Sequence, residues 1–143
     1  MTNAELARAL ARIGAMLEID GGNPFKVRAY KEGARVVENH GEALASIVNE
    51  PGALEAIDGI GKSIALAIRE LVASGHTQAM DALLKKYPDE VVSFTELQGL
   101  GPKRVKTLFD TLHIRTRAAL EEAAKNGQLR ELPGFGEKVE RTC

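Results

Sequence analysis

Three short glycine-containing segments carry the residues that could bind an anion. They read IDGIG at 57–61, LQGLG at 97–101 and LPGFG at 132–136. Glycines permit backbone angles closed to other residues and leave room for a ligand, and a helix that starts behind such a turn directs free N–H groups outward. With the lysine, arginine or serine that follows, the predicted contact set is Gly59, Ile60, Gly61, Lys62, Ser63, Gly99, Leu100, Gly101, Lys103, Arg104, Gly134, Gly136 and Lys138.

These segments do not match either of two known nucleotide-binding motifs. The phosphate-binding loop of nucleotide hydrolases needs a first glycine where this chain has Ala56, and a dinucleotide fingerprint needs a third glycine where it has Ile64. Several separated anion sites match a polymer of phosphates, so a nucleic-acid backbone is the expected ligand. The alternative is that each segment only forms a compact corner between two helices.

The elements around these segments are predicted to be helices. Leu6, Leu10, Ile13 and Leu17 form one apolar stripe that Thr2 or Asn3 can cap, and strand-like alternation is almost absent. Further helices are expected from Pro24 onward, over about 42–48, 63–73 and 78–87, and in the region 105–125. The sequence therefore predicts an all-α fold of two small helical subdomains, divided near 85–89.

The composition excludes several classes of function. The net charge of −1 argues against nucleic-acid binding by bulk charge alone, although basic stretches at 25–35 and 101–117 flank an acidic one at 36–58. Cys143 is the only cysteine, so no disulfide can form within the chain, and the three histidines lack metal-ligand spacing. Without a signal peptide or an apolar run of membrane-spanning length, a cytoplasmic protein is expected, with no membrane partner and no required cofactor.

The sequence resembles the N-terminal part of family X DNA polymerases, particularly the bacterial and archaeal members. The matching stretches are NPFKVRAYKEGARVV, IDGIGKSIALAI, LQGLGPKRVKTLFDTLHI and GQLRELPGFGEKVE. The resemblance implies a helical domain of the 8-kDa lyase type over 1–86, with the first helix-hairpin-helix motif. It implies a fingers-like subdomain over 90–143, with the second and third motifs.

The resemblance also implies a ligand. In the family these regions bind gapped or nicked duplex DNA during base excision repair. Binding is expected to be independent of base sequence, because glycine hairpins reach phosphates and sugars, which carry no base information directly. Lys26 and Tyr30 match positions that hold the 5′-phosphate of a gap. The backbone carbonyls of Ile57, Ile60, Thr95, Leu97 and Leu100 match positions at which hairpins bind Na⁺ or K⁺. For Lys26 and Tyr30 the structural alternative is a surface lysine and a core tyrosine.

No catalytic residue is predicted. The family's palm, which supplies the carboxylates for catalytic magnesium, has no counterpart here, and Ala67 stands where the lyase lysine would form its Schiff base. The expected function is DNA binding as a polymerase X-like module, either free-standing or part of a longer polymerase, with a separate palm or another repair protein as a partner. The alternatives are a deoxyribose-phosphate lyase that uses another lysine, such as Lys26 or Lys62, and a protein-interaction module.

Overall fold

The computed structural model describes residues 1–97, 100–132 and 135, and these residues form helices and turns without a strand. The α-helices are α1 (Asn3–Ile19), α2 (Pro24–Glu38), α3 (Lys62–Ser74), α4 (Gln78–Lys86), α5 (Asp89–Ser93), α6 (Pro102–Leu112) and α7 (Arg117–Lys125). Short 3₁₀ turns are η1 (Leu44–Ser46), η2 (Phe94–Glu96) and η3 (Leu129–Glu131). The predicted all-α fold is confirmed. None of the described helices is long and apolar enough to cross a lipid bilayer.

The first two helices begin at residues that the sequence marks as helix starts. The Thr2 hydroxyl accepts a hydrogen bond from the Glu5 N–H, and the Glu5 carboxylate accepts one from the Thr2 N–H. Asn23 caps α2 by accepting a hydrogen bond from the Phe25 N–H, and Pro24 takes the first helical position, where no N–H is needed. The predicted apolar stripe of α1 faces the core and is buried except at Leu17, which is partly exposed.

The prediction of a helix over 42–48 is wrong. Only the single 3₁₀ turn η1 forms there, closed by bonds from the Ser46 N–H to the Ala43 carbonyl and from the Ile47 N–H to the Leu44 carbonyl. Pro51 disfavours helical angles at Glu50, so a helix could span barely two turns. Leu44 alone is fully buried, and so short a segment does not offset the cost of nucleating an α-helix.

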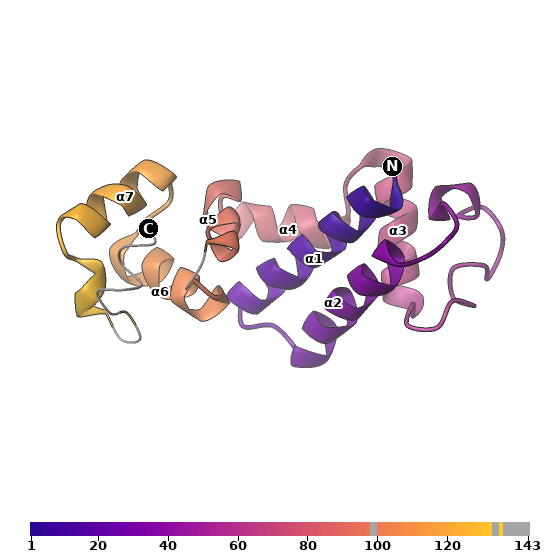
Figure 1. Cartoon of the computed structure of the whole chain (residues 1–143), viewed down its shortest axis with the longest axis horizontal. Coiled ribbons are helices and arrows are strands. Elements are labelled where there is room, and N and C mark those ends of the chain that lie inside the picture. Colours follow the sequence, from indigo (N-terminus) through magenta and orange to yellow (C-terminus); the bar gives the residue numbers. More distant parts are fainter. Residues whose placement is uncertain (98–99, 133–134, 136–143) are drawn as a thin grey trace.

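Two apolar cores lie along the molecule, and α1 contributes to both. The first core is formed by α1, α2, η1, α3 and the segment before α3. The second core contains Met16 and Ile19 from α1, together with residues from α4 to η3. Figure 1 shows α6 and α7 at one end of the molecule, while α1 runs side by side with α2, from beside α3 towards α6. The two halves therefore share a helix, while the domain limits 1–86 and 90–143 stay a prediction.

Tyr87 lies where the ends of α1 and α4 meet α6. Its hydroxyl donates a 2.8 Å hydrogen bond to Asp20 Oδ1, and its ring centroid lies 5.4 Å from that of Phe109. Burial, the hydrogen bond to Asp20 and the nearby carboxylates raise the pKa of Tyr87 to about 12, because each disfavours a phenolate. The hydroxyl thus keeps its proton at neutral pH and acts as a donor.

This shift predicts a specific loss of stability in alkali. A raised pKa means that the folded state binds the phenolic proton of Tyr87 more tightly than the unfolded state does. The stabilisation of the fold by this protonated hydroxyl is complete below the unfolded pKa of about 10 and is lost as pH rises towards 12. Tyr87→Phe should be less stable than wild type by about 1 kcal/mol at pH 8. The difference should shrink between pH 10 and 12 in urea unfolding. Burial and Glu70 raise the pKa of Tyr30 in both proteins, so Tyr30 does not affect the comparison. A constant difference from pH 8 to 12 would contradict the prediction.

Candidate nucleic-acid interface

The three glycine segments share one backbone hydrogen-bond pattern. In each, two successive turns are closed by an N–H that donates to the carbonyl three residues earlier. The donor–acceptor pairs are Ile57 to Leu54 and Ile60 to Ile57, Leu97 to Phe94 and Leu100 to Leu97, and Leu132 to Leu129 and Phe135 to Leu132, all at 3.0–3.1 Å. Gly99, Gly134, Gly136 and Lys138, four of the predicted contacts, lie outside the described residues.

The repeated unit is longer than the five residues seen in the sequence. Leu54, Phe94 and Leu129 each stand three positions before the start of a segment, and each is buried. The residue between the glycines is also buried, with exposed fractions of 4 % for Ile60, 3 % for Leu100 and 7 % for Phe135. These side chains therefore pack inward, so only the backbone of Ile60 and Leu100 remains for a ligand. The apolar residue at the third preceding position was the missed sequence signal.

The two glycines of the first hairpin have different roles. Gly59 has a φ of +92°, and a Cβ placed there would lie 2.7 Å from Val36 Cγ2. The conformation and packing therefore require glycine at this position. Gly61 has a φ of −87° and ψ of −176°, which other residues adopt easily, and a Cβ there would meet nothing within 4 Å. Its missing side chain leaves open space above the backbone.

The second hairpin repeats the conformation of the first at its second glycine. Gly101 has a φ of −89° and ψ of 174°, and a Cβ there would also meet nothing within 4 Å. Two equivalent glycines thus face open space although neither the backbone angles nor the packing demands glycine. This combination favours close approach of a ligand to the backbone over a purely structural corner.

The helices that follow these glycines start without a side-chain cap. The starts of α1, α2, α4 and α7 are capped by Thr2, Asn23, Thr77 and Thr116. The starts of α3, after Gly61, and of α6, after Gly101, have no such cap, because neither N-cap residue has a side chain that could accept from the first turn. The short helix α5, after Pro88, also lacks a side-chain cap. Free N–H groups at the positive end of the helix dipole suit an anion.

Basic side chains surround the two uncapped helix starts. Lys62 and Ser63 are exposed in the first turn of α3, and Lys103 is exposed in the first turn of α6. Arg104 is half-buried and already interacts with the protein. The structure therefore groups the predicted residues 59–63 at one helix start and 100–104 at another. Because two separated starts do not converge on one point, the arrangement fits an extended anion.

The predicted cation sites rest on main-chain oxygens. The Ile57 and Leu97 carbonyls each accept one turn hydrogen bond, and a carbonyl oxygen has a second lone pair. The Thr95 hydroxyl donates to the Val92 carbonyl at 2.8 Å. The described residues contain no cluster of His, Cys, Asp or Glu suited to a metal, which does not bear on a site made of carbonyls. Na⁺ or K⁺ at Ile57, Ile60, Thr95, Leu97 and Leu100 stays a prediction.

The two residues of the predicted 5′-phosphate pocket have different environments. Lys26 is exposed, whereas Tyr30 is only 7 % exposed and belongs to the first core. Burial first, and then the charge of Glu70, raises the pKa of Tyr30. Ala67, at the position of the family's lyase lysine, is 3 % exposed and packs in the same core. Lys26 is therefore the solvent-accessible member of the pair, and the pocket stays a prediction.

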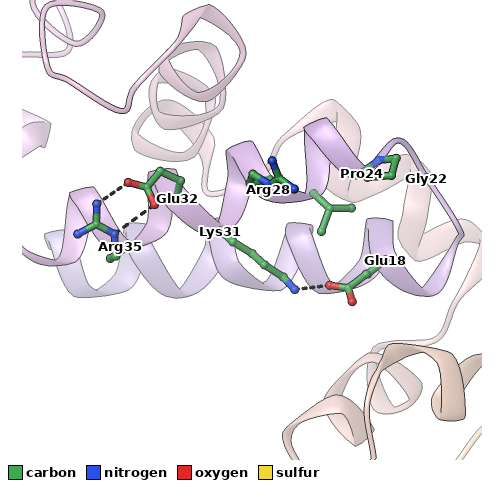
Figure 2. A pocket seen from close by; sticks show the side chains of 8 residues that line it. Glu18, Gly22, Pro24, Arg28, Lys31, Glu32 and Arg35 are labelled. Carbon is green, nitrogen blue, oxygen red and sulfur yellow. Dashed lines mark hydrogen bonds and ion pairs between the residues drawn. The ribbon is translucent and has the colours of Figure 1, made fainter.

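A basic groove on α2 was not predicted from the sequence. It has a volume of about 580 Å³ and is lined by Glu18, Gly22, Pro24, Val27, Arg28, Lys31, Glu32 and Arg35. Figure 2 shows Lys31 paired with Glu18 and Arg35 paired with Glu32, while Arg28 has no hydrogen bond or ion pair to a described residue. Arg35 keeps the pKa of Glu32 below its usual range. The sequence could have indicated this groove, because positions 24, 27, 28, 31 and 35 share one helical face.

This groove does not include Lys26 or Tyr30. Successive helical residues are about 100° apart, so the face centred on Lys31 lies roughly opposite Lys26. The basic stretch 25–35 is thus divided between two sides of α2, with a single lysine on the side predicted to meet the phosphate.

Comparison with known proteins finds the same motifs. A family described as "Helix-hairpin-helix domain" matches residues 1–77, and one described as "SAM-like Helix-hairpin-helix tandem" matches residues 91–142. The chain is 31 % identical over 140 residues to the DNA polymerase/3′-5′ exonuclease PolX of Bacillus subtilis, and it aligns with the N-terminal part of that protein. The alignment covers 98 % of this chain and 24 % of the relative, so the chain spans about a quarter of the relative's length. The predicted resemblance to the N-terminal region of family X polymerases is confirmed.

Proposed function

We propose that this chain, which belongs to the helix-hairpin-helix family, binds DNA through the phosphate backbone at its hairpins and does not read base sequence. The observation that carries the proposal is the matched pair of helix starts behind Gly61 and Gly101, both uncapped and facing open space. Backbone N–H groups and lysines bind phosphates, which fix position on DNA but carry no base information directly.

The preferred DNA in this proposal is a gapped or nicked duplex with a 5′-phosphate, in repair. The hairpin at Gly101 holds the duplex on one side of the gap, and Lys26 with the helix start at Lys62 holds the 5′-phosphate on the other. Two contacts made through one DNA raise the effective concentration of the second, so a gap should bind more tightly than an intact duplex. The resemblance supports this choice, and so do the exposure of Lys26 and the uncapped start of α3.

Further parts of the proposal follow from the relative. The chain acts as a DNA-binding module of a polymerase of the PolX kind, with a palm either on the same polypeptide or on a separate protein. Na⁺ or K⁺ on the hairpin carbonyls would bridge the protein to a phosphate. A cytoplasmic location agrees with such a role.

A phosphate-dependence assay tests the proposed function. We expect wild-type protein to bind a gapped duplex with a 5′-phosphate about fivefold more tightly than the same duplex with a 5′-hydroxyl, in fluorescence anisotropy. A terminal phosphate carries more charge than an internal diester, and a lysine near a helix start favours it. Lys26→Ala should reduce this preference.

The matched control is Lys85→Ala, which removes an exposed lysine from α4, outside the hairpins. It should leave the phosphate preference unchanged. Equal binding of the two DNAs by wild-type protein would eliminate the 5′-phosphate pocket and leave a general backbone binder. Absence of binding to any DNA at low salt would overturn DNA binding itself and favour a protein-interaction role.

A further inference from the structure

The two hairpin helices are packed against a common helix. Both α3 and α6 contact α1 directly, and α1 also contacts α2, α4 and α5. Figure 1 shows α1 along the middle of the molecule, between the end that carries α3 and the end that carries α6. The distance between the two helix starts is therefore set by how firmly α6 is held against the C-terminal end of α1.

Apolar contacts alone would not fix the orientation of α6 relative to α1. Met16 and Ile19 of α1 share the second core with Val105 and Leu108 of α6. Apolar burial is non-directional, so it favours contact without fixing one orientation. A hydrogen bond between fixed groups adds that direction, since it weakens steeply as its angle departs from linear.

A polar joint stands at the place where these helices meet. Besides donating to Asp20, the Tyr87 hydroxyl lies 3.5 Å from Lys106 Nζ, and that ammonium lies 5.9 Å from the centroid of the Tyr87 ring. Lys86 Nζ lies 3.4 Å from both carboxylate oxygens of Asp20. Asp110 holds the other side of Lys106 at 3.7 Å. The joint thus ties the end of α1, the end of α4 and the middle of α6.

Nothing in the hairpins requires this joint. Tyr87 is buried in the second core, where a phenylalanine would supply the same ring packing against Phe109. A buried hydroxyl must keep a partner to avoid a net cost, so the tyrosine ties the ring to Asp20. The main effect of the joint is therefore to fix the orientation of α6, because the ring alone would supply the apolar burial.

We propose that Asp20, Tyr87 and Lys106 hold the two hairpins at one separation, and that this separation selects the length of the gap that the protein binds best. The inference rests on the proposed function, because it needs one DNA to engage both hairpins. Tyr87 is a positioning residue, since it acts through α6 and lies outside the predicted DNA contacts.

Tyr87→Phe tests the joint, since it removes the hydroxyl and keeps the ring. Spin labels on cysteines at Leu66 of α3 and Thr111 of α6, both exposed, report the separation in protein without DNA, with Cys143→Ser to leave only the labelled thiols. We expect a narrow distance distribution in the parent and a broader one in the variant. Fluorescence anisotropy on 5′-phosphorylated duplexes with gaps of different lengths gives a Kd for each gap length. The discrimination is the Kd of the most weakly bound gap length divided by that of the most tightly bound one. That ratio should fall about fivefold in Tyr87→Phe, the factor that corresponds to one ordinary hydrogen bond.

Three further variants make the result specific. Asp20→Ala should reproduce Tyr87→Phe, whereas Asp20→Asn keeps an oxygen that can accept from Tyr87 and should retain most of the discrimination. Ser93→Ala removes a hydroxyl bonded within its own helical turn, to the Glu90 carbonyl, and should behave as wild type. Circular dichroism on each variant establishes that it is folded.

The outcomes separate the joint from the proposed function. An unchanged distance distribution and gap ratio in Tyr87→Phe would overturn the role of the joint. If wild-type protein binds every gap length equally, the gap specificity itself fails, and the label distances, measured without DNA, still report whether Tyr87 holds the two hairpins in place.

Discussion

Gly59→Val is expected to lower the free energy of unfolding by about 2–5 kcal/mol, the sum of two effects. A φ of +92° is strained for any residue with a Cβ, and a branched side chain has no room beside Val36, which a Cβ would approach to 2.7 Å. Urea unfolding followed by circular dichroism measures the loss. Because the hairpin joins the segment at Leu54 to α3, any DNA binding should fall with the folded fraction.

The matched control lies two residues along the chain. Gly61→Val places the same side chain at a φ of −87° in open space, so its effect on stability should stay near 1 kcal/mol, the usual cost of a poor N-cap residue. Its DNA affinity should fall while the protein stays folded. Equal stability of Gly59→Val and wild type would show that the turn can rearrange, and would contradict the requirement for glycine.

Gly101→Val should weaken DNA binding about tenfold or more, the effect of losing a charge-assisted hydrogen bond to phosphate. Its φ of −89° accepts valine, and the added side chain would extend into the open space in front of the α6 start. The protein should therefore stay folded, which circular dichroism checks alongside anisotropy. Lys103→Ala and Arg104→Ala should also weaken binding uniformly across DNA sequences, and each should lower the salt slope of log K by about one.

A variant at the other end of the same helix serves as the control. Thr111→Val alters an exposed residue in the last turn of α6 and should bind DNA as wild type does. If Gly101→Val, Lys103→Ala and Arg104→Ala are all folded and bind DNA like wild type, the second hairpin is a structural corner only. A strong preference for one base sequence would contradict backbone recognition at either hairpin.

The local features of this protein were determined by its sequence. The cap at Thr2 and the helix start at Pro24 were predicted, and each depends on residues within four positions. The hairpins were predicted for the same reason, since their turns are closed by bonds between residues three apart. The error at 42–48 was also local in origin, because a periodic apolar pattern does not reveal whether a short helix is long enough to form.

The tertiary structure alone decided which of these features meet. Sequence spacing left open whether Tyr30 is a core residue or part of a phosphate pocket, and the packing of α2 decided that it is buried while Lys26 stays exposed. It gave no sign that Asp20 and Tyr87, 67 positions apart, would form a hydrogen bond. Such contacts exist only after α1 is packed against both cores, because apolar burial of whole helix faces, which no short segment can achieve alone, brings distant residues within hydrogen-bonding distance.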